Sequence, residues 1–164
     1  MRCAAQAMPN LVHMDRVEDV RVDHFRGLLQ RRHPRGILIG GGSPCQGNSS
    51  LNTKRKGLDD PRSQQPLELQ RIIHEFRALP EAAGMEIVAF LENVASMPAH
   101  VRDQYSTWLG CQPICMDAAS CVWVRRRRLF WLCSATWGVS AQTPPPASWT
   151  WAPNETTVPI YASL

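Results

Sequence analysis

GILIGGGSPCQ, residues 36–46, is the stretch of sequence that decides the fold. Its first seven residues are an apolar run closing in three glycines, which predicts a buried strand that ends in a tight loop. The loop carries Ser43, Pro44, Cys45 and Gln46. We therefore expect Cys45 to lie just beyond the carboxyl end of a strand, in a loop that exposes its side chain.

A second strand is predicted at residues 87–91, IVAFL, and Glu92 and Asn93 follow it directly. Between the two strands, apolar residues recur at helical spacing after a proline, which predicts a helix over residues 66–79. Strand, helix and strand form the unit that makes two strands parallel, so both loops leave the sheet at the same edge. Ligands of open α/β sheets bind at that edge, which is where chemistry is expected from Cys45 and Glu92.

The rest of the chain continues the mixed pattern. A second helix is predicted over residues 99–109 and should stop at Gly110. Residues 113–116 and 121–133 look extended, and the later stretch places four arginines between apolar flanks. Residues 141–164 are rich in proline and are expected to form an irregular tail.

Composition sets broad limits on the class of protein. The chain has 164 residues, of which 44% are hydrophobic and 20% charged, as in one globular domain. No apolar run approaches the length of a membrane span, and the N-terminus lacks the apolar region of a secretion signal, so we expect a cytosolic or nuclear protein. The net charge of +4 is only weak evidence for a polyanionic partner. The cysteines include no C-x-x-C pair, so we expect free thiols and no metal.

Three short motifs occur in order: Ser43–Gln46, Glu92–Val94 and the pair Arg126-x-Arg128. In order and spacing they resemble the three central motifs of the DNA cytosine-5 methyltransferases, closest to the de novo-type animal enzymes. The resemblance covers roughly residues 18–138. It implies an α/β, Rossmann-like S-adenosylmethionine-dependent methyltransferase fold with a mostly parallel sheet.

Other parts of that family are not found in the sequence. The Phe-x-Gly-x-Gly loop, which holds the methionine end of the cofactor, and the target-recognition region are both missing. We therefore expect residues 1–140 to be the central part of a catalytic domain, with an incomplete fold and cofactor pocket, and residues 141–164 to be the tail.

The resemblance implies methyl transfer from S-adenosylmethionine to C5 of cytosine in DNA, with Cys45 as the nucleophile. A thiolate that adds at C6 turns the ring into an enamine whose C5 can attack a methyl group, and sulfur adds and leaves readily. Glu92, as a protonated carboxyl near N3, and Arg126 and Arg128, near O2, would stabilise charge on the base. Desolvation at the end of an apolar strand should raise the pKa of Glu92 and favour its acid form.

Cofactor and substrate contacts also follow from the resemblance. Asp19 and Val20 resemble the motif that holds the adenine of S-adenosylmethionine. The residues expected at the substrate are Ser43, Pro44, Gln46 and Asn93. Asn93 is further expected to brace the cysteine loop by hydrogen bonds. The polar loop at residues 47–61, which carries Lys54, Arg55 and Lys56, is expected to close over DNA after a base has been flipped out.

The four consecutive arginines allow two interpretations. Alternate side chains of a strand share a face, so Arg126 and Arg128 would point toward the site and Arg125 and Arg127 away from it. The alternative is a nuclear-localisation signal or a nonspecific polyanion-binding patch. Apolar neighbours such as Trp123 favour a core-like segment.

Three functions remain open at this stage. The first is the DNA methyltransferase, which would bind DNA and act in the nucleus, or in the cytoplasm of a prokaryote. The second is a tRNA cytosine-5 methyltransferase on the same scaffold, although Asp117-Ala118 and Phe130-Trp131 resemble the DNA enzymes. The third is an inactive methyltransferase-like subunit that binds nucleic acid or a homologous methyltransferase subunit. No membrane association is expected.

Overall fold

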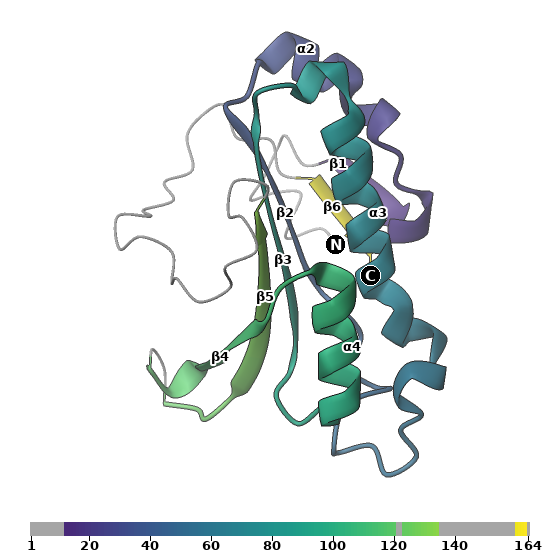
Figure 1. Ribbon diagram of the computed structural model, residues 1–164, viewed down its shortest axis with the longest axis vertical. Helices are drawn as coiled ribbons and strands as arrows, with labels where there is room; N and C mark the ends of the chain where they lie inside the picture. Colours follow the sequence, from purple (N-terminus) through teal and green to yellow (C-terminus); the bar gives the residue numbers. More distant parts are fainter. Residues whose placement is uncertain (1–11, 121–122, 135–159, 164) are drawn as a thin grey trace.

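The computed structural model describes residues 12–120, 123–134 and 160–163 (Figure 1). An α/β arrangement is built on a four-stranded sheet with the order β2-β3-β5-β4. Its strands are β2 (Gly36–Gly42), β3 (Glu86–Val94), β4 (Pro113–Asp117) and β5 (Arg127–Ser134). Two more strands, β1 (Val12–Arg16) and β6 (Ile160–Ser163), form a separate parallel pair.

Helices cover one face of the four-stranded sheet. The longest are α3 (Gln65–Ala78) and α4 (Ala99–Leu109), which lie side by side on that face, while α2 (Arg26–Arg32) packs near the far end of α3 (Figure 1). Single turns of 3-10 helix fill the connections: η1 (Val17–Asp19), η2 (Val22–Phe25), η3 (Gly57–Asp59), η4 (Pro61–Gln64), η5 (Pro80–Ala82) and η6 (Ala118–Ser120). None of the described helices is long and apolar enough to cross a membrane.

The predicted strand-helix-strand unit is confirmed. Strands β2 and β3 are parallel, and their register pairs Gly42 with Glu92. The helix between them spans Gln65–Ala78, within one residue of the predicted bounds. The second predicted helix, α4, has the predicted bounds, and it ends because Gly110 takes the left-handed conformation with φ 69°.

The sheet is mixed, so the prediction of a mostly parallel sheet is wrong. Strand β5 runs antiparallel to both of its neighbours, β3 and β4. The cause is the short connection at residues 118–126, because only antiparallel strands can be joined without a crossover helix.

Strand β2 lies at the edge of the sheet and is not buried as predicted. Within the described residues its hydrogen-bonded neighbour is β3 alone. Its residues alternate between exposed and half-buried, and the side chain of Leu38 is 51% exposed. Strand β3 also buries only one face completely, with Ile87, Ala89 and Leu91 toward the helices.

The extended segment predicted at residues 121–133 is shorter in the structure. Strand β5 begins at Arg127, and Cys121 and Val122 lie outside the described residues. Trp123 is fully exposed, which contradicts its assignment to a core-like segment. In the predicted irregular tail, Ile160–Ser163 form β6, while the rest of the tail lies outside the described residues.

Two hydrophobic clusters hold the elements together. One cluster packs η1, η2 and α2 against α3, with Phe25 and Phe76 stacked at 5.7 Å between ring centres. The other fills the space between α3, α4 and the sheet around Trp131 and Tyr105, both of which are fully buried. The indole of Trp131 is satisfied there by a 3.0 Å hydrogen bond that it donates to Ser106 Oγ.

Glycines in β2 allow side chains of β3 to lie directly against the β2 backbone. A Cβ on Gly40 would overlap the ring of Phe90. A Cβ on Gly42 would lie 2.7 Å from Oε2 of Glu92. The run of three glycines therefore makes room for two specific side chains, one apolar and one acidic.

We predict that Gly40→Ala destabilises the fold by about 1–3 kcal/mol, because the added methyl group overpacks the contact with Phe90. Urea unfolding of the purified chain measures the change. In a Phe90→Leu background the same substitution should cost less, since the smaller side chain can yield. An equal cost in both backgrounds would show that the clash with the ring is not the cause.

Candidate active site

The cysteine loop, residues 43–56, starts where β2 ends beside β3. The backbone N–H of Ser43 donates to the carbonyl of Glu92 at 3.2 Å, which continues the strand pairing by one residue. The chain then turns sharply, because the carbonyl of Cys45 accepts from the N–H groups of Asn48 (2.9 Å) and Ser49 (2.7 Å). The Cys45 side chain is half-buried against the second hydrophobic cluster.

Glu92 and Arg128 form an ion pair across two strands. Arg128 Nε lies 2.7 Å from Glu92 Oε1, and the side chains are 24% and 28% exposed. The pair is made possible by the pairing of β3 with β5 and by the missing side chain at Gly42. Each partner therefore holds the other in place while staying accessible to a small molecule at the sheet edge.

A network of buried polar groups lies behind the cysteine loop. Asn93 Nδ2 donates to Ser43 Oγ at 2.6 Å, as expected of a bracing residue. Asn48 Nδ2 donates to the hydroxyl of Tyr105 at 3.1 Å, and Ser63 Oγ donates to Asn48 Oδ1 at 3.3 Å. Burial raises the pKa of Tyr105, and hydrogen bonds from Asn48, Ser63 and Ser43 partly oppose that rise.

The cysteine loop is also tied to the connection between β3 and α4. The guanidinium of Arg55 donates to the carbonyl groups of Asn48 (3.4 Å) and Ser96 (3.3 Å). Ser96 Oγ accepts from the N–H of Ser50 at 3.2 Å. Between these contacts the loop tip projects into solvent, and its Leu51 side chain is 94% exposed.

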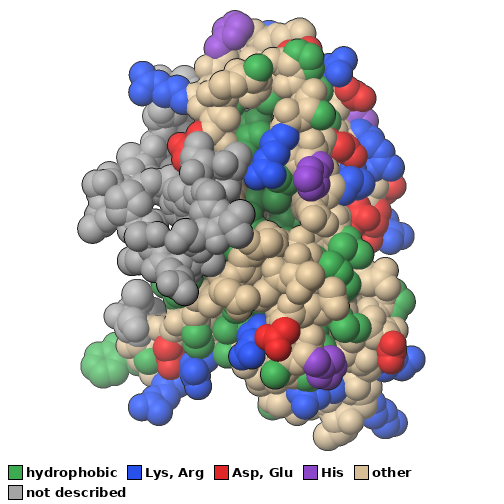
Figure 2. All heavy atoms as spheres, viewed as in Figure 1, with side chains coloured by type: hydrophobic (Ala, Val, Ile, Leu, Met, Phe, Trp, Pro, Cys, Tyr) green, Lys and Arg blue, Asp and Glu red, His purple; other side chains and the backbone are tan. Residues whose placement is uncertain are grey.

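Exposed basic side chains are also found at this end of the molecule. Lys and Arg atoms are seen at the lower end in Figure 2, where the loop after β2 and the β4–β5 connection lie in Figure 1. Lys54, Arg55 and Lys56 in the loop are exposed, and so are Arg125 and Arg126 in the connection. This charge distribution suits a polyanionic ligand at that end.

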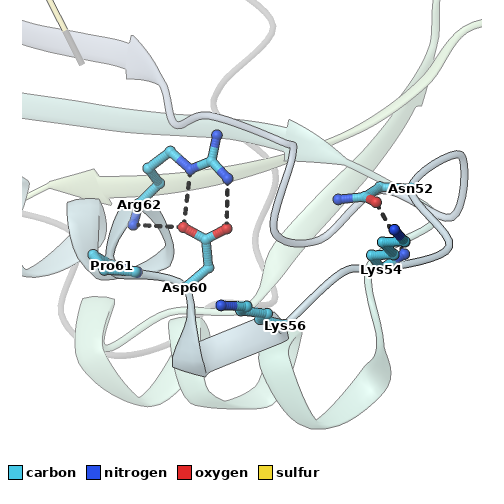
Figure 3. A pocket seen from close by; sticks show the side chains of 6 residues that line it. All are labelled: Asn52, Lys54, Lys56, Asp60, Pro61 and Arg62. Carbon is cyan, nitrogen blue, oxygen red and sulfur yellow. Dashed lines mark hydrogen bonds and ion pairs between the residues drawn. The ribbon is translucent and has the colours of Figure 1, made fainter.

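A pocket of about 350 Å³ opens beside the loop (Figure 3). Its lining residues are Asn52, Lys54, Lys56, Asp60, Pro61 and Arg62. Asp60 accepts two hydrogen bonds from the guanidinium of Arg62, at 2.9 and 2.7 Å, and one from its backbone N–H at 3.1 Å. The guanidinium of Arg62 lowers the pKa of Asp60 to about 2.

The side chains of the four arginines do not simply alternate between the two faces of one strand, as was predicted. Arg128 reaches Glu92, while the guanidinium of Arg127 lies 3.6 Å from the sulfur of Cys115 on β4. Arg126 precedes β5: its N–H donates to Asp117 Oδ1 at 2.9 Å, and its side chain is exposed. The prediction that Arg126 lies within the strand is therefore wrong, because its backbone closes the turn before the strand begins.

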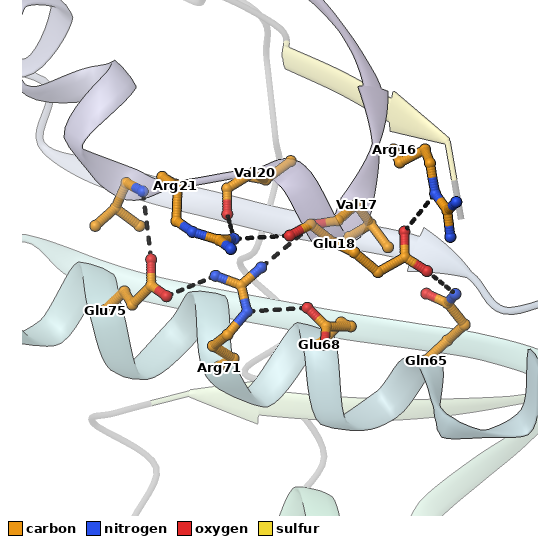
Figure 4. A network of polar contacts seen from close by, with 10 residues as sticks. Arg16, Val17, Glu18, Val20, Arg21, Gln65, Glu68, Arg71 and Glu75 are labelled. Atoms are coloured by element: carbon orange, nitrogen blue, oxygen red, sulfur yellow. Dashed lines mark hydrogen bonds and ion pairs between the residues drawn. The ribbon is translucent and has the colours of Figure 1, made fainter. Parts of the chain in front are cut away.

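The segment expected to hold adenine is tied to α3 (Figure 4). Gln65 Nε2 donates to Glu18 at 3.1 Å, and the guanidinium of Arg71 donates to the carbonyl of Val17 at 3.3 Å. Asp19 is exposed, but Val20 is a core residue, only 5% exposed. Its carbonyl already accepts from the guanidinium of Arg21 at 3.1 Å.

These residues do not fit the whole of S-adenosylmethionine. Asp19 offers an exposed carboxylate, whereas Val20 can offer neither its side chain nor a free carbonyl. Among the described residues, the pocket of Figure 3 lies at the cysteine loop and includes neither Asp19 nor Val20. Of the two residues expected at the cofactor, only Asp19 thus presents a side chain that could contact the adenosine end.

The structure brings together most of the side chains predicted at the site. Ser43 and Asn93 are in direct contact, and Glu92 and Arg128 are paired beside them. Pro44 is half-buried, and Gln46 is exposed with its carbonyl accepting from Asn52 Nδ2 at 2.6 Å. Sequence reasoning missed the buried polar groups behind the loop: Asn48, Ser63 and Tyr105. The sequence offered no clear signal, because Asn48, Ser63 and Tyr105 stand among small or polar neighbours, where an amide or a hydroxyl is usually exposed.

Comparison with known proteins identifies a methyltransferase as a partial relative. No family model matches the chain. Over 56 residues the chain is 46% identical to the Type II methyltransferase M.AquIA of Picosynechococcus sp.. The matched stretch is 34% of this chain and spans about a fifth, 21%, of that relative. Part of the chain is therefore similar to a methyltransferase.

We predict that the Asp60–Arg62 contact makes stability depend on pH. Since the folded-state pKa of Asp60 is about 2, below the ordinary value of about 3.9, the stabilisation is complete above about pH 5 and is mostly lost by about pH 2. Asp60→Asn should therefore lower the free energy of unfolding near pH 6, with a gap to wild type that closes by about pH 2.

Urea unfolding at a series of pH values measures this gap. Asp59→Asn is the matched control, because it removes the same charge from the exposed neighbouring residue. A gap between wild type and Asp60→Asn that stays constant down to pH 2 would contradict the assignment.

Proposed function

We propose that this chain carries the reaction centre of a DNA cytosine-5 methyltransferase, with Cys45 as nucleophile and S-adenosylmethionine as methyl donor. The observation that carries the proposal is the Glu92–Arg128 pair at the sheet edge where the cysteine loop begins. The partial similarity to a methyltransferase supports it. In this proposal residues 1–140 belong to a catalytic domain of the Rossmann-like methyltransferase kind.

Cytosine would take over the contacts that Glu92 and Arg128 now make with each other. Addition of the Cys45 thiolate to C6 moves electron density onto N3 and O2 of the ring. Glu92, in its acid form, donates its proton at N3, and Arg128 stabilises the negative charge at O2. Glu92 takes its proton from solvent when cytosine separates it from Arg128, and the Cys45 thiol releases one proton to solvent. The proton that N3 gains is therefore balanced by the proton that the thiol loses. The resulting enamine has a nucleophilic C5, ready to accept a methyl group.

Access to the base requires its extrusion from the duplex, because C6 cannot be reached inside the stack. Leu51, exposed at the loop tip, is an apolar side chain suited to fill the space that the extruded base leaves. Lys54 and Lys56 follow that tip in the sequence, are exposed, and can contact phosphates. In this proposal DNA is the partner, and the protein acts where DNA is, in a nucleus or in prokaryotic cytoplasm.

A covalent-trapping experiment tests the function. We predict that the chain forms an adduct, stable to denaturing electrophoresis, with a pool of random duplex DNA in which 2-pyrimidinone replaces cytosine. This base accepts a thiolate at C6 without any methyl donor, so the experiment does not depend on binding of S-adenosylmethionine. Peptide mass spectrometry should locate the adduct at Cys45, and Cys45→Ala should abolish it.

The absence of any adduct of wild type with DNA or RNA would overturn the proposal, and so would either of two other results. One is an adduct that persists in Cys45→Ala at the wild-type rate. The other is no adduct with DNA although a matched pool of RNA hairpins carrying the same base is trapped, which would favour the RNA-directed enzyme.

Substitutions of the neighbouring residues Arg127 and Arg128 are predicted to affect different steps, DNA binding and reaction respectively. Arg128→Ala removes the charge-assisted contact to O2, so trapping should slow by about 10²- to 10³-fold. Arg127, which reaches toward Cys115 on β4, should mainly affect DNA affinity. Arg127→Ala should reduce the salt dependence of DNA binding by about one phosphate contact at most. Trapping rates at matched ionic strength and the salt dependence of binding separate the two, and equal rate losses would support a simple basic patch.

A further inference from the structure

Five buried polar residues bracket Cys45 in the structure. They are Ser43, Asn48, Ser63, Asn93 and Tyr105, which we call the polar network, and all are 5% exposed or less. Two of them lie in the cysteine loop itself, on either side of the thiol. The others come from separate elements: η4, the end of β3, and α4.

Tyr105 is fixed within the polar network by its ring. The ring packs on Trp108 and Trp131, with centres 5.8 and 5.6 Å away, and the residue is fully buried. Its hydroxyl accepts a hydrogen bond from Asn48. The hydroxyls of Ser43 and Ser63 lie close enough to oppose the rise in the pKa of Tyr105. A rigid helix thereby presents one polar atom to residues before and after Cys45.

Asn48 transmits this contact to the backbone of Cys45. Its side chain bonds Tyr105 and Ser63, while its N–H donates to the carbonyl of Cys45 at 2.9 Å. Gly47 precedes Asn48 in the loop and is closely packed, since a Cβ on it would lie 2.8 Å from Ser63 Oγ. A shift of Asn48 therefore moves the turn that carries the thiol.

Apolar residues of similar shape would fill this space at little cost in stability. Amides and hydroxyls buried in a core must be matched to one another in geometry, and replacing all partners by apolar groups is often nearly neutral. What a satisfied network adds is a single defined arrangement of the groups that it joins. In this protein the polar network therefore fixes the conformation of the loop that carries the thiol.

We propose that Tyr105 and Asn48 are positioning residues for Cys45, acting through the polar network to hold the thiol in the orientation for attack on the base. This rests on the proposed function in so far as Cys45 is the nucleophile. Neither residue touches the substrate. Their effect is on the geometry of the loop, to which addition reactions are steeply sensitive.

The test compares three variants with wild type. Tyr105→Phe keeps the packed ring and removes only the hydroxyl. An apolar variant, Asn48→Leu/Ser63→Ala/Tyr105→Phe, replaces the hydrogen-bonding partners together. Ser106→Ala is the matched control, because it removes a buried hydroxyl from the same helix, one that accepts from Trp131 and lies outside the polar network.

Two rates are measured at Cys45 together with the urea midpoint. The first is the rate of covalent trapping on the 2-pyrimidinone DNA. The second is the rate of alkylation by iodoacetamide, resolved by peptide mass spectrometry and divided by that of the exposed Cys115. Tyr105→Phe should slow trapping by about 10- to 100-fold. It should also raise relative alkylation severalfold, because a loosened loop exposes the half-buried thiol.

The apolar variant separates positioning from stability. We expect its urea midpoint to be close to that of wild type while its trapping stays slow, and Ser106→Ala to change neither rate. Recovery of the trapping rate together with the midpoint would overturn the proposal, since the polar network would then be structural only. So would equal effects of Ser106→Ala and Tyr105→Phe.

Failure of the proposed function has a different signature. If wild type forms no adduct, the assignment of Cys45 as nucleophile fails. The alkylation rates still decide whether the polar network controls the Cys45 loop: a rise in Tyr105→Phe and in the apolar variant supports that control, and unchanged rates refute it.

Discussion

The close approach of the β2 backbone to the side chains of β3 is the constraint on which the site depends. The parallel register sets Gly42 beside Glu92, and the missing Cβ leaves the carboxylate free to reach Arg128 on the next strand. The same register brings Ser43 N–H to the carbonyl of Glu92, which fixes where the cysteine loop departs. Three segments distant in sequence thus meet because the last three residues of β2 are glycines.

The local elements could be predicted from the sequence because each is marked by neighbouring residues. Helical spacing and a terminal glycine gave the bounds of α4, and an apolar run gave β2. Strand order could not be predicted in this way. The order depends on which strands β5 pairs with. The short connection after Asp117 indicates a hairpin of β4 and β5, but it does not indicate that β5 also pairs with β3. The same hairpin leaves Arg126 in the turn.

The candidate site was predictable where a motif or a strand end marked it. Asn93 and Glu92 follow an apolar run directly, so the sheet edge was their expected place. The contact between Asn48 and Tyr105 spans 57 residues and joins a loop to a helix. No spacing rule connects such residues, and Tyr105 at a helical core position is most simply interpreted as packing. Only the three-dimensional arrangement shows its hydroxyl turned toward the loop.

The open side of β2 has a consequence for assembly. Over its seven residues, GILIGGG, β2 has no charge, no proline and no bulky polar group, the devices that usually protect an edge strand. Among the described residues no strand pairs with the outer side of β2, so the N–H and C=O groups on that side can accept another strand and extend the sheet. Glycine-rich strands specify pairing register weakly, so the incoming strand must itself provide the side chains that prevent slippage. The register of pairing along β2 is therefore set by the incoming strand. A strand whose side chains do not fix that register would pair with β2 in several registers.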